Sequence, residues 1–161
     1  MQHTATGSAV LGDLLQINKD CFTACLQIIE NNKDRTLYLL LEKLVDLERD
    51  ISLELREVVD AAFGDPAAAV EKKGEIYRSW QENAALRFPA REKDICSFCE
   101  RKLQAIYTAY ERALNQESGL PERVISMLIL HVKRMKELVD CIRQYKNEKN
   151  SSARNLLVAH Y

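Results

Sequence analysis

Residues 35–63 decide the fold class of this chain and read RTLYLLLEKLVDLERDISLELREVVDAAF. Within them, one row of side chains recurs at steps of three and four residues, and all but Glu48 are apolar: Leu37, Leu41, Leu44, Glu48, Ile51, Leu55, Val58 and Ala62. That spacing places the row on one face of an α-helix and predicts that this face is buried in a core. At about 1.5 Å per residue the helix would be about 43 Å long, which is typical of a long bundle helix.

Similar rows predict three further long helices, over residues about 10–31, 91–116 and 121–147. A less regular helix, interrupted by Gly74, is expected over residues about 67–87. Turn-forming residues separate these segments, as in Gly64-Asp65-Pro66, where Gly suits a helix end and Asp-Pro suits a helix start. The sequence contains no strand pattern and no internal repeat, so we predict an all-α protein.

Short connections join the first two helices and the last two helices, which predicts two antiparallel hairpins. The segment of residues 64–90 must then carry the chain from one hairpin to the other. We therefore expect a ferritin-like up-down four-helix bundle with a long helical crossover between its second and third helices. The bundle would form a single domain over residues 10–149, with a disordered N-terminus over 1–9 and a C-terminal tail over 150–161. The tail holds a small apolar cluster, Leu156-Leu157-Val158.

The charges of the chain nearly balance. Its 161 residues include 23 Lys+Arg and 24 Asp+Glu, for a net charge of -1. Proteins that bind nucleic acid usually carry a basic face, so no nucleic-acid partner is expected. The longest apolar run, Leu37 to Leu41, is far too short to cross a bilayer, and no signal-peptide pattern opens the sequence. These observations predict a cytoplasmic protein without a membrane partner.

Several short motifs point to a family resemblance. They are Leu15-Gln16-Ile17-Asn18-Lys19-Asp20, Gly74 with Arg78 and Trp80, Cys99-Glu100-Arg101 with Ala105, and Ala109-Tyr110-Glu111-Arg112-Ala113-Leu114. Through them the chain from Leu11 to about Lys146 resembles a bacterial family of ferritin-like bundles known as domain of unknown function 2383. The chain departs from the family in Lys102-Leu103, where members tend to have Gly-Glu, and in Thr23-Ala24-Cys25, where they tend to have Glu-Gly-Tyr. The family has no settled activity, so the resemblance implies the fold rather than a function.

A ferritin-like fold raises the question of a di-iron site. Such a site needs about six inward ligands, including a Glu-x-x-His motif on each of two helices. The three histidines are His3, His131 and His160, and no Glu-x-x-His motif occurs in the sequence. We therefore expect no di-iron cofactor and assign no catalytic residue.

Four cysteines form one candidate site. Cys21 and Cys25 are one helical turn apart in the first helix, and Cys96 and Cys99 are one turn apart in the helix over 91–116. In the expected topology both pairs lie near the same end of the bundle, so their thiols could bind zinc or a softer metal, or act in redox chemistry. The alternative, which we favour, is that these cysteines are small buried residues that allow close helix packing.

Asn18, Glu48 and His131 form a second candidate site, of buried polar residues. Asn18 and Glu48 both lie about 13 residues, or about 20 Å of helix, from the end where the first two helices meet. We expect these two side chains to hydrogen-bond across the bundle, with His131 or Arg134 nearby. Such a contact would fix helix register, and the alternative is a reduced carboxylate metal site around Glu48.

Tyr77 and Trp80 lie in the expected crossover. Trp80 is expected to anchor that segment in the groove between the long helices, and the alternative is that the two residues form an interface for a partner. Because the packing pattern is strong and no catalytic constellation is present, we predict a non-catalytic bundle with a role in protein interaction or stress, acting by self-association or with another protein. The alternative is a metal-binding ferritin-like protein that uses the cysteines or the carboxylate site.

Overall fold

The computed structural model describes residues 7–31, 33–63, 74–83, 92–116 and 119–159. These residues form helices α1 (Gly7–Asn31), α2 (Arg35–Phe63), α4 (Glu75–Asn83), α5 (Glu92–Asn115) and α6 (Glu122–Ala159). Within these ranges every regular element is an α-helix, which confirms the predicted all-α class.

Two helix boundaries differ from the sequence-based prediction. α1 begins at Gly7 rather than at about residue 10, so residues 7–9 are helical, and residues 1–6 lie outside the described residues. α6 continues to Ala159 instead of ending at about residue 147. No glycine or proline stands between Asn147 and Ala159, so nothing local stops the helix there. The helix expected over 67–87 is described only as α4, and its remainder lies outside the described residues.

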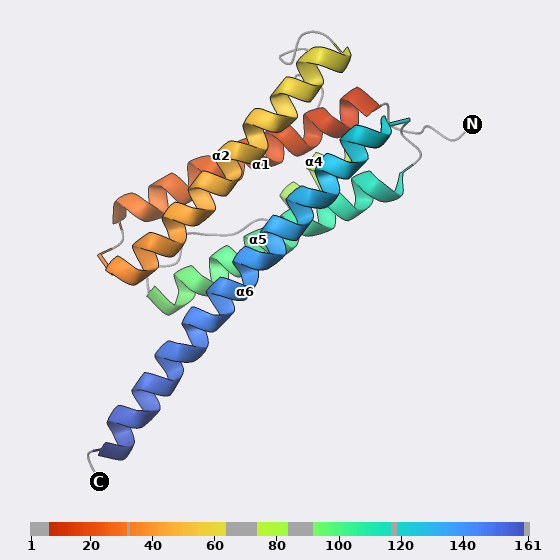
Figure 1. Cartoon of the computed structure of the whole chain (residues 1–161). Coiled ribbons are helices and arrows are strands. Elements are labelled where there is room, and N and C mark those ends of the chain that lie inside the picture. Colours follow the sequence, from red (N-terminus) through yellow and green to blue (C-terminus); the bar gives the residue numbers. More distant parts are fainter. Residues whose placement is uncertain (1–6, 32, 64–73, 84–91, 117–118, 160–161) are drawn as a thin grey trace.

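The four long helices pack in a closed ring. α1 contacts α2, α2 contacts α6, α6 contacts α5, and α5 contacts α1 (Figure 1). The short helix α4 packs on the outside of this ring against α1 and α5. The core between the helices is mainly aliphatic, and its largest fully buried side chains are Tyr110 and Phe98 of α5.

Neighbouring helices of the ring run antiparallel. Along α1 the chain passes first Asn18, which contacts Tyr110, and then Cys25, which interacts with Cys99 from an earlier part of α5. α2 and α6 are antiparallel as well, because Asp50 pairs with Arg134 and the later Glu54 pairs with His131. Helices on opposite corners of the ring, such as α2 and α5, are therefore parallel.

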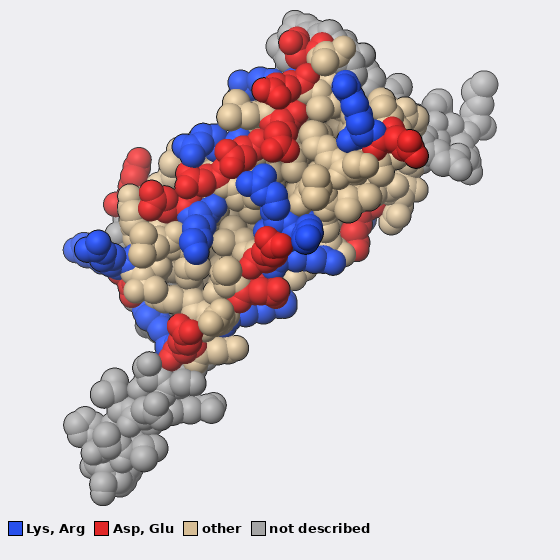
Figure 2. Space-filling model, viewed as in Figure 1, with Lys and Arg blue, Asp and Glu red and all other residues tan. Residues whose placement is uncertain are grey.

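The face formed by α2 and α6 carries charges of both signs. Figure 2 shows basic and acidic side chains next to each other over these two helices. Arg134 of α6 lies 3.2 Å from Asp50 of α2, and Arg143 of α6 lies 2.6 Å from Glu100 of α5. Within the described ranges, no helix is both long and apolar enough to cross a membrane.

The helix α4 is held by a carboxylate from another helix. Gly74 stands at its N-cap position and has no side chain that could cap the helix. Asp13 of α1 replaces that cap: its Oδ1 accepts from Gly74 N at 2.7 Å and its Oδ2 accepts from Tyr77 N at 3.2 Å. A Cβ added at Gly74 would lie 2.5 Å from Asp13 Oδ2, so a larger residue there would have to displace the carboxylate that caps α4.

We predict that Asp13→Ala lowers the free energy of unfolding by about 1–3 kcal/mol, because it leaves two backbone N–H groups at the start of α4 without an acceptor. The measurement is urea denaturation followed by circular dichroism. Asp60→Ala, in the exposed part of α2, is the control and is expected to stay within about 0.5 kcal/mol of the wild type. Equal stability of the Asp13 variant and the wild type would contradict the capping role.

Candidate functional site

Four buried cysteines from two helices lie close together in the core, and we call them the thiol cluster. Cys21 and Cys25 belong to α1, Cys96 and Cys99 belong to α5, and all four are free thiols. Cys25 interacts electrostatically with Cys21 on its own helix and with Cys99 on the neighbouring helix, and Cys99 interacts with Cys96. The antiparallel packing of α1 on α5 thus brings together two pairs that are far apart in sequence.

Glu48 of α2 extends the thiol cluster to a third helix. Its side chain is 2% exposed, and the Cys25 thiol donates a long hydrogen bond to its Oε1 at 3.9 Å. Its other carboxyl oxygen has no hydrogen-bond partner among the described residues. Lys102 of α5 is also buried, and its charge acts on Glu48 and on the thiols of Cys21 and Cys99.

The environment of the thiol cluster favours neutral side chains. Burial raises the pKa of Glu48 from 4.5 to about 8, and the nearby Lys102 opposes this shift only in part. Burial also raises the pKa of Cys99 to about 12 and the pKa values of Cys21 and Cys25 well above their ordinary value, with Glu48 adding to the effect. Since the thiolate is the form that attacks electrophiles and binds metals, the cluster becomes reactive only when protons leave it.

Among the described residues, no group of three or more His, Cys, Asp and Glu side chains is arranged to hold a metal ion. His131 is engaged with Tyr110 and Glu54, and the buried carboxylate of Asp13 holds the start of α4. Neither side chain is therefore available as an inward metal ligand in this arrangement.

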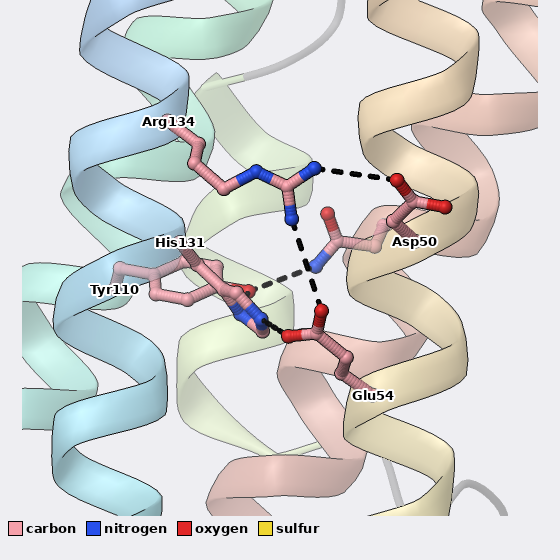
Figure 3. Close-up of polar contacts among 6 residues, drawn as sticks. Asp50, Glu54, Tyr110, His131 and Arg134 are labelled. Atoms are coloured by element: carbon pink, nitrogen blue, oxygen red, sulfur yellow. Dashed lines mark hydrogen bonds and ion pairs between the residues drawn. The ribbon is translucent and has the colours of Figure 1, made fainter.

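A second polar region connects the core to the surface, and we call it the Tyr110 network. The Tyr110 hydroxyl lies 3.1 Å from His131 Nδ1, and Asn18 Nδ2 donates to the same hydroxyl at 3.4 Å (Figure 3). On the other side of the imidazole ring, His131 Nε2 lies 2.6 Å from Glu54 Oε2. Arg134 then contacts Glu54 at 3.8 Å. The network crosses from α1 through α5 and α6 to α2.

One protonation pattern satisfies every hydrogen bond of the Tyr110 network. Burial lowers the pKa of His131, although Glu54 opposes that shift, so a neutral imidazole is favoured at neutral pH. With its proton on Nε2, His131 donates to Glu54, and its Nδ1 accepts from the Tyr110 hydroxyl. The hydroxyl oxygen of Tyr110 is then free to accept from Asn18 Nδ2. With a neutral His131 the network links four helices, and its charged members, Glu54 and Arg134, lie at the partly exposed end.

The structure separates the polar residues that we expected to pair. Asn18 and Glu48 are both buried, but Asn18 bonds to Tyr110 and to the Leu14 carbonyl, whereas Glu48 lies against Cys25. Asn18 and His131 are connected through Tyr110, which the sequence analysis did not single out as a site residue. The sequence did offer a signal for this role. Tyr110 follows Leu103 and Ile106 at helical spacing, which places it on the buried face of α5, and a buried hydroxyl needs a hydrogen-bond partner.

Tyr77 and Trp80 do not form an exposed interface. Tyr77 is 3% and Trp80 is 8% exposed, and their rings lie against each other with centroids 5.6 Å apart. The Tyr77 hydroxyl donates to Asp20 of α1 at 2.6 Å. The two aromatic residues therefore hold α4 on the bundle, which is the anchoring role expected for Trp80.

Two surface cavities flank α5. One, of about 250 Å³, lies between α5 and α6, where Lys136 Nζ stands 4.9 Å from the centre of the Tyr107 ring. The other, of about 230 Å³, lies between α4 and α5 beside Trp80.

No family model matches this sequence, and no curated protein and no solved structure matches it.

We predict that Glu48 makes the free energy of unfolding fall as pH rises. Its pKa is raised in the folded state, to about 8, so the folded protein holds this proton more tightly than the unfolded chain does. The stability that it contributes is therefore complete below about pH 4.5 and is lost as pH rises through about 8, and the loss is on the order of 5 kcal/mol. Glu48→Gln removes this loss, so the variant becomes more stable than the wild type as pH rises.

Urea denaturation of both proteins over a series of pH values measures this difference. Other titrating groups are common to both chains and cancel when the two profiles are subtracted. Glu111→Gln, an exposed substitution on α5, is the control and is expected to follow the wild-type profile. A difference between the wild type and Glu48→Gln that does not change with pH would contradict the prediction.

Proposed function

We propose that this protein is a non-catalytic, ferritin-like helical bundle that acts through protein interaction, and that it associates with a second copy of itself. The arrangement of the helices supports the fold, and the length of α6 supports the interaction.

The arrangement of the helices supports a ferritin-like fold. α2 and α5 are parallel and stand at opposite corners of the ring, so the chain between them has to return along the length of the bundle. α4 belongs to that connection and packs along α1 and α5. A single long connection between two antiparallel hairpins is the topology of ferritin-like bundles.

The buried polar groups support a structural role for the core. The hydrogen bonds of the Tyr110 network and of Asp13 join helices of the same chain. The thiols of Cys21 and Cys25 are shifted toward the neutral form, which is the less reactive one. These groups contribute to register and stability, which favours an interaction role over catalysis.

The observation that carries the interaction proposal is the length of α6. The Lys149 ammonium group pairs with Asp34, before the start of α2, at 3.0 Å. Beyond Lys149 the helix continues to Ala159, past the ends of α1, α2 and α5 (Figure 1). We call residues 150–159 the α6 extension; it adds about 15 Å of helix.

A second copy of this chain is the partner that we propose for the α6 extension. Most helices in proteins owe their stability to the packing of one face, and the α6 extension lies past the ends of α1, α2 and α5, so a second chain is a natural packing partner for it. Its sequence includes Leu156, Leu157 and Val158, and a two-fold axis would place these segments of two chains against each other. Self-complementary contacts of this kind are the commonest in soluble oligomers.

We predict that the full chain is a dimer and that a chain ending at Lys149 is a monomer with the same bundle. Sedimentation velocity measures the mass, and circular dichroism checks that the truncated chain remains helical. Leu157→Asp is expected to reproduce the truncation, and Asn155→Asp is the matched control that adds the same charge beside the apolar cluster. A monomeric full chain, or a dimeric truncated chain, would overturn the proposal.

A second candidate function is the binding of a soft metal ion by the thiol cluster. The convergence of two cysteine pairs from α1 and α5 favours it, since thiolates select soft metals. The described side chains are not arranged as a metal site, so the thiols would have to move together when the ion binds. Metal binding would have to displace the thiol protons that burial retains.

Elemental analysis of protein purified under reducing conditions without chelator tests this second function. The metal hypothesis predicts stoichiometric zinc or copper in the wild type and its loss in Cys96→Ser/Cys99→Ser, whereas Glu48→Gln retains the metal. Retention by the cysteine variant and loss by Glu48→Gln would indicate a carboxylate site instead. Wild-type protein that contains no metal and takes up none from added zinc or copper would eliminate this function.

A further inference from the structure

The carboxylate of Asp34 joins the start of α2 to the part of α6 that directly precedes the α6 extension. Its Oδ1 accepts from the backbone N–H of Leu37 at 2.9 Å, which is the contact of a helix N-cap. Its Oδ2 accepts from Lys149 Nζ at 3.0 Å and from the Tyr145 hydroxyl at 3.4 Å. One side chain therefore caps α2 and holds α6 at the same time.

The groups around Asp34 hold one another in a partly sheltered position, and we call Asp34, Tyr145 and Lys149 the Asp34 clamp. Tyr145 belongs to the buried core, so its ring is fixed by packing. The Lys149 ammonium group stands 5.3 Å from the centre of that ring, which adds a cation–π contact to the ion pair. Since Tyr145 and Lys149 are one helical turn apart, the clamp holds a complete turn of α6 against the start of α2.

The α6 extension begins at the residue after the clamp. Beyond Lys149 the helix passes the ends of α1, α2 and α5 (Figure 1). A helix grows more readily from a turn that is already formed than from a new nucleus, so a fixed turn at its root favours a helical extension. A segment that is ordered before it binds also loses less conformational entropy on association.

We propose that Asp34 is a positioning residue for self-association: through Tyr145 and Lys149 it fixes the root of the α6 extension and directs that helix toward a second copy of the chain. This inference rests on the self-association proposed above. Because the ion pair between Asp34 and Lys149 is partly exposed, salt screens it, whereas salt does not screen apolar contacts between two extensions. The association should therefore weaken as ionic strength rises.

Asp34→Asn tests the clamp, because asparagine caps a helix about as well as aspartate but carries no charge to pair with Lys149. At about 0.05 M sodium chloride, hydrogen exchange of residues 150–159, followed by mass spectrometry, is expected to be about threefold faster than in the wild type. The dimer Kd from sedimentation is expected to be about threefold higher. Both differences should disappear at about 1 M sodium chloride. Asp46→Asn is the matched control, because Asp46 pairs with Arg49 on its own helix, and it is expected to change neither value.

Variants of Lys149 separate the ion pair from a general effect on the helix. Lys149→Arg keeps the charge and is expected to behave as the wild type, whereas Lys149→Gln is expected to reproduce Asp34→Asn. Combining Asp34→Asn with Lys149→Gln should add nothing, since both remove the same interaction. A dimeric wild type whose exchange and Kd match those of Asp34→Asn, or a difference that persists in high salt, would overturn the role of Asp34 alone. A monomeric wild type would overturn self-association and this proposal with it.

Discussion

The burial of α1 against three other helices constrains the rest of the structure. α2, α4 and α5 all pack on it, so the polar side chains of its inner faces cannot rely on water. Each of them meets a different neighbour: Asp13 binds the start of α4, Asn18 binds Tyr110 of α5, and Cys25 contacts Glu48 of α2. Because an unpaired buried polar group costs about 1–3 kcal/mol, these contacts fix the rotation of α1 and the level at which its neighbours stand.

Two of the few polar groups in the mainly aliphatic interior favour their neutral forms. Burial raises the pKa of Glu48 and lowers that of His131, and both shifts favour the neutral form near neutral pH. The charged pairs lie nearer the surface, where Glu100 accepts from Arg143 and Lys146, an arrangement that lowers the pKa of Glu100. This division keeps the desolvation cost of the core low, because the charged pairs stay close to water.

Two parts of the chain depart from a simple ring of four helices. α4 adds a fifth helix outside the ring, and its groove with α5 exposes a cavity beside an otherwise buried tryptophan. α6 continues beyond its neighbours and presents a length of helix at one end. The core explains why the bundle is stable, whereas the α6 extension is the part that we propose contacts a second copy of the chain.

The amino-acid sequence by itself determined the helical class and much of the helix placement. The apolar row from Leu37 to Val58 predicted α2 with its observed boundaries, and the placement of Glu48 in that row correctly indicated a buried carboxyl group. Periodicity specifies which face of a helix is buried, but it does not specify the partner helix or the level of contact along it. Only the tertiary structure therefore decided that Asn18 meets Tyr110 rather than Glu48, and that Asp13 caps a helix more than sixty residues away. It also decided that Trp80 lies beside a cavity, because such contacts arise from packing between segments that are distant in sequence.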